Sequence, residues 1–195
     1  MELKESILER RSIRKYQDKK VPAHLIYEIF DTIRFSPSSG NTQCWKFIIV
    51  EDQKKRTEIA TAALEQMWMS EAPIHIIVCN QHKKVTTLYG KLGKMFSIQD
   101  CSIISAYLML VAKEHNLGTC WVGAFDNEAI KRILDIPDDI DPEAIITLGY
   151  PQKIKLNKSK RKEVNDILFF DKWGSKSKNF KKDNIIKKIK SKLKK

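Results

Sequence analysis

The sequence predicts an α+β fold in which a sheet of four or five strands is wrapped by helices. Residues 74–79 form a near-continuous β-branched run, which is typical of a strand buried on both faces. Other segments have apolar residues at helical spacing, and strands and helices do not alternate regularly along the chain. No G-x-G-x-x-G motif occurs, which disfavours a dinucleotide-binding Rossmann domain.

The first half of the chain is predicted to contain three helices and two strands. Apolar spacing predicts a helix over residues 2–11 and a second one that starts at Pro22, a residue suited to a first helical turn. This second helix should stop before Pro37, because the residue ahead of a proline resists the helical conformation. The remaining elements expected here are a strand at 45–50, a helix at 57–70 and the buried strand at 74–79.

The second half is organised around one long helix. Ser97 and Asp100 are spaced as an S-x-x-D capping pair that would begin this helix, and Gly118 is a suitable residue to end it. Because the segment is apolar around most of its circumference, it is expected to be buried in a core or in a subunit interface. The other expected elements are strands at 119–125 and 144–148, and a short helix from Asp126 to near Pro137.

The net charge of +12 is concentrated at the C-terminus. Residues 176–195 contain ten lysines and one acidic residue, a charge of +9, which leaves +3 for residues 1–175. We therefore divide the chain into a domain over residues 1–175 and a basic tail over residues 176–195. The tail places Ile185, Ile189 and Leu193 on one helical face, so an alternative function is contact with an anionic membrane or a nucleic acid.

The cysteines and histidines do not predict a metal site. Four cysteines occur without a CxxC pair, and four histidines occur without an HExxH motif, so reduced, packed thiols and no metal are expected. The N-terminus lacks the apolar core of a signal peptide, and the longest apolar runs are far shorter than the ~20 residues of a membrane span. We expect a cytoplasmic protein.

Two basic segments could bind phosphate. The segment RRSIRKY presents three guanidinium groups and a hydroxyl within five positions, and arginine binds phosphate in a bidentate manner. Its candidate residues are Arg10, Arg11, Ser12 and Arg14. A second basic group, Lys160 and Arg161, follows the sequence GYP later in the chain. Taken singly, each segment is also compatible with a solvated charge run.

Two further segments could contact a flat ligand. The loop SPSSGNTQ carries side chains that can hydrogen-bond ring edges and hydroxyls, and its candidates are Pro37, Ser38, Ser39, Asn41 and Gln43. The segment GTCWVGAF is a strand that ends in glycine and alanine, which permits close approach to its backbone. Its candidates are Trp121, Val122, Gly123 and Ala124. A polar turn and a buried strand are the alternative interpretations.

The joint occurrence of these motifs in this order resembles the nitroreductase family. RRSIRKY, SPSSGNTQCWKF, the SIQD segment, GTCWVGAF, ITLGYP and KRK match the family from about Glu5 to Gly174. One departure is Cys44, because many family members have proline at this position before the tryptophan.

The resemblance implies a mostly antiparallel sheet flanked by helices, in an intertwined homodimer whose two active sites lie at the subunit interface. It implies that Arg10, Arg11, Ser12 and Arg14 hold the phosphate and polar edge of FMN, and that the Pro37–Gln43 loop comes from the second subunit. Trp121 to Ala124 would lie along the flavin. Arg161, or Lys160 if the register differs, would be a further phosphate ligand.

The activity implied is an FMN-dependent oxidoreductase that transfers hydride from NADH or NADPH to a small acceptor, such as a nitroaromatic or a quinone, in two half-reactions. The flavin carries the chemistry, so no catalytic side chain is predicted. Specialised flavin chemistry on the same fold, such as oxygen-dependent flavin cleavage, is an alternative, as is an anionic-surface binding protein that acts through the tail.

Overall fold

The computed structural model describes residues 2–153 and 159–176. Two compact units divide the chain, residues 1–154 and 155–195. The boundary predicted after residue 175 lies inside the second unit, and the apolar face predicted for the tail at 185–193 falls outside the described residues. In the part of the second unit that is described, one short helix occurs, α7 (Val164–Ile167).

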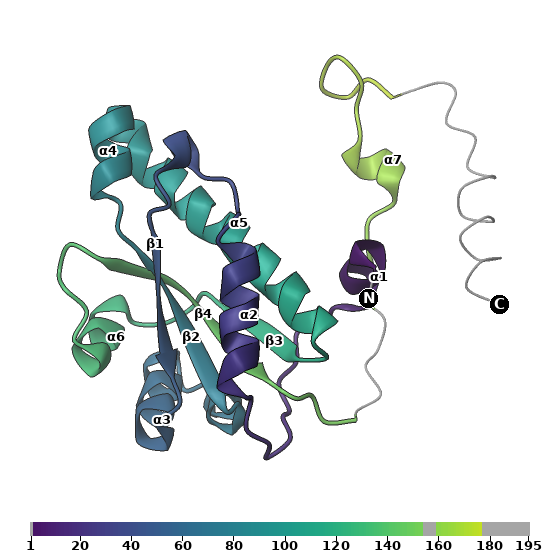
Figure 1. Ribbon diagram of the computed structural model, residues 1–195. Helices are drawn as coiled ribbons and strands as arrows, with labels where there is room; N and C mark the ends of the chain where they lie inside the picture. The colour runs from purple at the N-terminus through teal and green to yellow at the C-terminus, as the bar shows by residue number, and fades with distance from the viewer. Residues whose placement is uncertain (1, 154–158, 177–195) are drawn as a thin grey trace. The chain divides into compact units, whose positions relative to one another are not determined.

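The first unit consists of a four-stranded sheet with helices on both faces (Figure 1). Its strands are β1 (Trp45–Val50), β2 (Ile74–Asn80), β3 (Gly118–Val122) and β4 (Asp141–Gly149). Its α-helices are α1 (Leu3–Glu9), α2 (Ala23–Ile33), α3 (Gln53–Ala62), α4 (Lys83–Tyr89), α5 (Gly93–Glu114) and α6 (Asn127–Leu134). Short 3-10 turns are η1 (Ser39–Asn41), η2 (Met67–Glu71) and η3 (Gly90–Leu92).

The sheet has the strand order β1-β2-β4-β3, and every neighbouring pair is antiparallel. This confirms the α+β prediction, including an antiparallel sheet of four strands. Strand β2 lies in the interior of the sheet and all seven of its residues are buried, as its β-branched run predicted. Because both faces of β2 are covered, this strand has no polar face.

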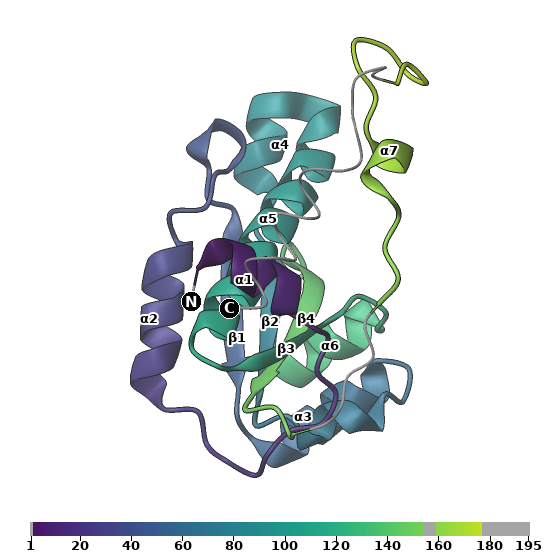
Figure 2. The same ribbon diagram turned by 90° about the vertical axis from the view of Figure 1, so that its right-hand side faces the viewer.

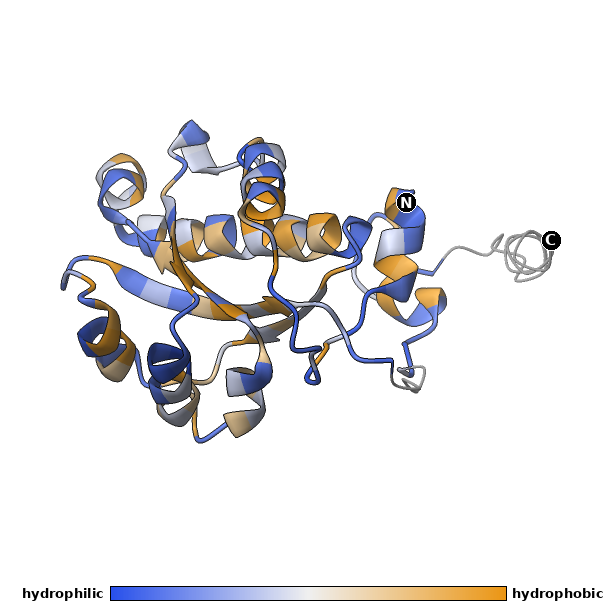
Figure 3. Ribbon diagram, turned by 60° about the horizontal axis from the view of Figure 1, so that its bottom comes forward, coloured by the Kyte–Doolittle hydropathy of each residue, from blue (hydrophilic) through white to orange (hydrophobic). Residues whose placement is uncertain are grey.

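Each sheet face carries its own apolar core. Ile76 and Ile146 point toward the layer formed by α2 and α5, where they pack with Ile29 and Leu108. Ile77 and its register partner Ile145 point the other way, into a second core with residues of α3 and α6 such as Ile59 and Ile130. The alternation follows from the two-residue period of a strand, and Figure 3 shows helices above and below the sheet with apolar residues facing it.

Two predicted helix boundaries are wrong. Helix α5 begins at Gly93, so Ser97 and Asp100 are buried inside it and cap nothing. The predicted cap at its end is also wrong: α5 ends at Glu114, and Gly118 belongs to β3. The predicted capping pair failed because these two polar side chains are turned inward, where they bond to other segments of the chain.

The helix predicted at 57–70 is also wrong in its bounds. Helix α3 begins four residues earlier, where the side chain of Asp52 accepts a hydrogen bond from the backbone N–H of Lys55. It ends at Ala62, because Leu64 and Glu65 both have positive φ angles near 56°. The prediction missed this local N-cap and read the separate turn η2 as a continuation of the helix.

The N-terminal segment is added to the sheet beside β3. Ser12 forms a parallel bridge with Thr119, and the backbone N–H of Ile13 donates to the Thr119 carbonyl at 2.9 Å. Gly118 permits this approach, since a Cβ there would lie 2.7 Å from Cγ1 of Ile13. The close packing of Ile13 on β3 therefore explains why position 118 is glycine, a residue that the sequence alone suggested as a helix end.

Helix α5 is a core helix. The run from Lys83 to Glu114 is long and apolar enough by composition to cross a membrane. However, α5 packs its inner face onto the sheet, and that face includes buried Ser97, Asp100 and Ser105. Burial against the sheet accounts for only part of its hydropathy, since 39 % of the apolar window is buried within one chain.

Candidate functional site

The basic segment after α1 lies along the outer edge of β3 (Figure 2). Arg10 caps α1 and is half-buried, whereas Ser12 and Arg14 are exposed. The guanidinium of Arg14 lies 5.4 Å from the centroid of the Trp68 ring, a cation–π contact. Arg11 behaves differently, because its Nη1 donates to the carbonyls of Leu8 and Arg10 at 2.9 and 2.8 Å.

The thiol of Cys120 lies beneath this segment. Burial raises its pKa, and the charges of Arg14 and Arg10, together with a hydrogen bond to Ser12, oppose that effect. Arg10, Ser12 and Arg14 occupy alternate positions of the segment that Ser12 bridges to Thr119 of β3. The structure brings together three of the four residues predicted for the phosphate at the edge of this strand.

The end of β3 continues from this cluster. Val122 is buried, whereas Trp121 is 37 % exposed and Gly123 and Ala124 are exposed. Strand β3 ends at Val122, shorter than the predicted 119–125, so Gly123 and Ala124 follow it as irregular chain. A Cβ on Gly123 would lie 3.1 Å from Nε1 of Trp121, so the glycine leaves room for the indole.

The predicted ligand loop is a folded turn in this structure. Gly40, Asn41 and Gln43 have positive φ angles of 54°, 54° and 49°, which is uncommon for residues other than glycine. The turn is closed by a hydrogen bond from the N–H of Gln43 to Oγ of Ser38 at 3.0 Å, and Nε2 of Gln43 lies 3.2 Å from Oδ1 of Asn41. Pro37, Asn41 and Gln43 are exposed, so their side chains are available to a ligand.

Asp100 of α5 anchors this loop. Its carboxylate accepts hydrogen bonds from the backbone N–H of Ser39 at 3.0 and 3.1 Å and from the Ser39 hydroxyl at 3.0 Å. Cys44, at the base of the loop, places its Sγ 3.8 Å from Oδ2 of the same carboxylate. On the other side, a Cβ on Gly40 would lie 2.9 Å from the Tyr89 hydroxyl, so the turn is closely packed.

The loop from Pro37 to Gln43 and the basic segment from Arg10 to Arg14 lie near opposite ends of α5. Ser39 is bound at Asp100, whereas Glu9, the neighbour of Arg10, forms an ion pair with Lys113 at 3.4 Å. Thirteen residues separate Asp100 and Lys113, which corresponds to about 20 Å of helix. Within one chain, the basic segment and the loop are therefore far apart.

Lys160 and Arg161 belong to the second unit and are exposed. Nη1 of Arg161 donates to the Lys160 carbonyl at 3.2 Å. Their role as phosphate ligands stays a prediction.

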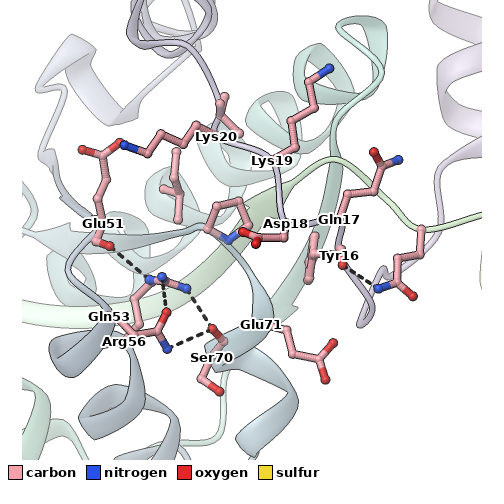
Figure 4. A pocket seen from close by; sticks show the side chains of 14 residues that line it. Tyr16, Gln17, Asp18, Lys19, Lys20, Glu51, Gln53, Arg56, Ser70 and Glu71 are labelled. Atoms are coloured by element: carbon pink, nitrogen blue, oxygen red, sulfur yellow. Dashed lines mark hydrogen bonds between the residues drawn. The ribbon is translucent and has the colours of Figure 1, made fainter.

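A separate cavity of about 710 Å³ opens between residues 16–21 and the start of α3, and it contains none of the predicted site residues (Figure 4). Its buried cation is Arg56, whose guanidinium donates to the carbonyls of Glu51, Ser70 and Ala72. Burial lowers the Arg56 pKa. The close-up shows this side chain of α3 turned toward Ser70 of η2, so that it joins the two elements. Arg56 is thus a structural residue with most of its donors already used.

Sequence reasoning missed Asp100 and Tyr16 as supports of the site. The signal for Asp100 was a carboxylate within an apolar helix, which requires buried donors. The signal for Tyr16 was its place at the end of RRSIRKY, and its hydroxyl donates to the Ile13 carbonyl at 2.7 Å. Among the described residues, no group of three or more histidine, cysteine or acidic side chains is arranged to hold a metal ion.

Comparison with known proteins identifies the family. The nitroreductase family model matches residues 7–150. A protein of Methanothermobacter thermautotrophicus, provisionally named NADH dehydrogenase/NAD(P)H nitroreductase, is 36% identical over 157 residues, which cover 77% of this chain and 78% of the relative.

Two solved structures are similar over most of the chain. The nitroreductase family protein of Clostridium novyi NT is 30% identical, with a TM-score of 0.72 and coverage of 90% of this chain and 97% of that one. The FMN-dependent nitroreductase of Clostridium difficile R20291 is 25% identical, with a TM-score of 0.74 and coverage of 86% and 98%. This chain belongs to the nitroreductase family, because the family model matches residues 7–150, a relative is 36% identical and the fold is shared with a solved member.

Proposed function

We propose that the protein is an FMN-dependent oxidoreductase that passes hydride from NADH or NADPH to a small acceptor, such as a nitroaromatic or a quinone, in two half-reactions. The observation that carries this proposal is that the segment bearing Arg10, Ser12 and Arg14 pairs with the edge of β3, within a chain of the nitroreductase family. The family relative from Clostridium difficile is named as FMN-dependent, which supports the same cofactor here.

The donor set beside β3 fits a phosphate. Guanidinium groups form charge-assisted, bidentate hydrogen bonds with phosphate oxygens, and a hydroxyl adds a neutral donor. Arg10, Ser12 and Arg14 supply these groups at one place, and Trp68 holds the Arg14 side chain against the body. Arg11 is a weaker candidate, because two of its contacts already stabilise the end of α1. Lys160 and Arg161 stay predicted phosphate ligands from the sequence resemblance.

The segment from Trp121 to Ala124 fits the flat face of a ring system. Its backbone from Trp121 to Ala124 is the proposed contact, and Gly123 and Ala124 are both exposed and carry little or no side chain. When bound, FMN would supply the capacity to accept a hydride and donate it to a second substrate. The residues of this chain would bind and orient the flavin, and exclude water from it.

We propose that a second copy completes the site. Helix α5 exposes large apolar side chains on the face away from the sheet: Met95, Ile98, Ile103 and Tyr107 are 36–48 % exposed. Leu3, Ile7 and Leu8 of α1 are also more than half exposed. Such surfaces typically mark an interface. Since the loop and the basic segment lie near opposite ends of α5 in one chain, a homodimer would bring the loop of one copy to the basic segment of the other.

The cofactor is tested by comparing FMN with riboflavin, which lacks the phosphate. Wild-type protein should be yellow and should bind FMN more tightly than riboflavin. Arg14→Ala should reduce that preference by about tenfold, because a charge-assisted hydrogen bond to phosphate is lost. Arg132→Ala, an exposed arginine on α6, is the matched control and should leave the preference unchanged. Colourless protein that takes up no added FMN would refute the cofactor.

The reaction is tested with the flavin-loaded enzyme. Steady oxidation of NADH or NADPH that depends on a nitroaromatic or a quinone is the expected result. Loss of FMN itself in the presence of oxygen would instead support flavin cleavage. Size measurement in solution tests the dimer, and a monomer that binds FMN fully would contradict the shared site.

A further inference from the structure

Asp100 is a buried acidic residue with an unusual set of partners. It is 3 % exposed, lies on the buried face of α5, and receives hydrogen bonds from the backbone N–H and the side-chain hydroxyl of Ser39. A buried carboxylate is costly unless donors surround it, so these bonds are part of what stabilises its burial. The loop is thereby tied to α5 through Ser39.

The bond to Asp100 fixes the direction of the Ser39 hydroxyl. A hydroxyl has one proton to donate and two lone pairs that accept. The Ser39 hydroxyl donates its one proton to Oδ1 of Asp100 at 3.0 Å. Toward a ligand, Ser39 therefore offers lone pairs.

We propose that Asp100 is a positioning residue that makes Ser39 an obligate hydrogen-bond acceptor, so that the loop selects a ring edge bearing an N–H group. This rests on the proposed function, in which the loop contacts FMN. The polar edge of oxidised FMN carries a single N–H, at N3, between two carbonyls. An acceptor on the loop suits that N–H, whereas a freely rotating hydroxyl could also donate to either carbonyl.

The surroundings of Ser39 maintain this arrangement. The turn is closed between Ser38 and Gln43, and Gly40 packs against the Tyr89 hydroxyl. Tyr89 is held in turn by an edge contact with Phe96, with ring centroids 5.2 Å apart. The loop is thus ordered before any ligand arrives, which reduces the entropic cost of binding.

The test compares FMN with 3-methyl-FMN, whose N3 has no hydrogen. The dissociation constant of each is measured by fluorescence titration of the full chain freed of flavin. Wild-type protein should prefer FMN by about tenfold, the value of one neutral hydrogen bond. Ser39→Ala and Asp100→Ala should each reduce the ratio of the two dissociation constants to near one, and the double variant should reduce it no further.

The ratio of the dissociation constants of 3-methyl-FMN and FMN distinguishes a positioning role of Asp100 from a merely structural one. Loss of the Asp100 charge, or of overall stability, affects both flavins alike and cancels in the ratio. The matched control is Ser97→Ala, which removes another buried hydroxyl from α5 that accepts from Asn80 at 2.9 Å and does not bond to the loop through its side chain. This variant should lower the melting temperature and keep the wild-type ratio.

Three outcomes would overturn the proposal. If wild-type protein binds FMN and 3-methyl-FMN equally, no acceptor bonds to N3. If Ser39→Ala still prefers FMN over 3-methyl-FMN, the preference arises from another residue. A preference lost in Ser39→Ala but kept in Asp100→Ala shows that Asp100 does not set the direction of the hydroxyl. In all three outcomes FMN still binds, whereas wild-type protein that takes up neither flavin refutes the proposed function as well.

Discussion

The hydroxyl of Tyr16 lies 2.7 Å from Oγ1 of Thr147, deep in the protein, and joins the N-terminal segment to β4. The same hydroxyl donates to the Ile13 carbonyl at 2.7 Å. Burial raises the pKa of Tyr16 well above its usual value, so the hydroxyl remains protonated over the whole working range of pH. The segment that carries Arg10 to Arg14 is therefore held from its far end by one phenol.

Replacement of Tyr16 by phenylalanine should destabilise the protein by about 1–3 kcal/mol, because the buried Ile13 carbonyl and Thr147 hydroxyl lose a partner. Urea unfolding measures the change. We also expect weaker FMN binding, since the basic segment is less firmly held. Tyr27→Phe, at a position that is 77 % exposed, is the control and should change neither quantity. Equal stability of Tyr16→Phe and wild type would contradict this role.

Gly118→Ala should destabilise the protein by about 1–3 kcal/mol, because the new Cβ would lie 2.7–3.0 Å from three atoms of Ile13. The clash is relieved if Ile13 is also shortened. In an Ile13→Ala background the same glycine substitution should therefore cost at least about 1 kcal/mol less. Thermal or urea unfolding of wild type, the two single variants and the double variant gives the coupling energy between Gly118 and Ile13. Strictly additive effects would show that Gly118 is needed for some reason other than the approach of Ile13.

His75 should make the stability depend on pH. Burial lowers its pKa from 6.5 to about 4, while Nε2 bonds to the Met69 carbonyl at 2.8 Å. Between pH 6.5 and 4 the unfolded chain binds a proton that the folded chain does not. The contribution of His75 to the free energy of unfolding should therefore fall as the pH decreases through this window, by roughly 3 kcal/mol in total, and change no further below it.

The measurement is urea unfolding at several pH values between 7 and 4. His75→Gln removes the titrating group and should show a shallower loss of stability than wild type over this range. His24→Gln, at an exposed position, should follow the wild-type curve. Parallel curves for wild type and His75→Gln would contradict the assignment.

Mixed dimers should reveal which chain supplies the loop. One subunit carries Arg10→Ala with Arg14→Ala, and the other carries Ser39→Ala with Gln43→Ala. If the loop crosses to the partner, one site of the mixed dimer collects all four substitutions and the other has none. One FMN per dimer should then bind with wild-type affinity. Two weakened sites, with none of wild-type affinity, would show instead that each chain uses its own loop.

The sequence by itself determined the class of fold and most of its elements. The buried strand at 74–79, the helix after Pro22 and the cap at Asp126 follow from local periodicity and from hydrogen bonds between residues close in sequence, so they could be predicted without a structure. The order of the motifs also predicted the family, which the comparisons confirm.

Only the tertiary structure decided the roles of residues whose partners are distant in sequence. Asp100 was expected to cap a helix and instead binds Ser39, which lies 61 positions away; Gly118 was expected to end a helix and instead makes room for Ile13. Such contacts depend on which faces of α5 and β3 turn inward, and local spacing does not specify them. The distance between the loop and the basic segment within one chain likewise follows from packing against the two ends of α5, which no single motif contains.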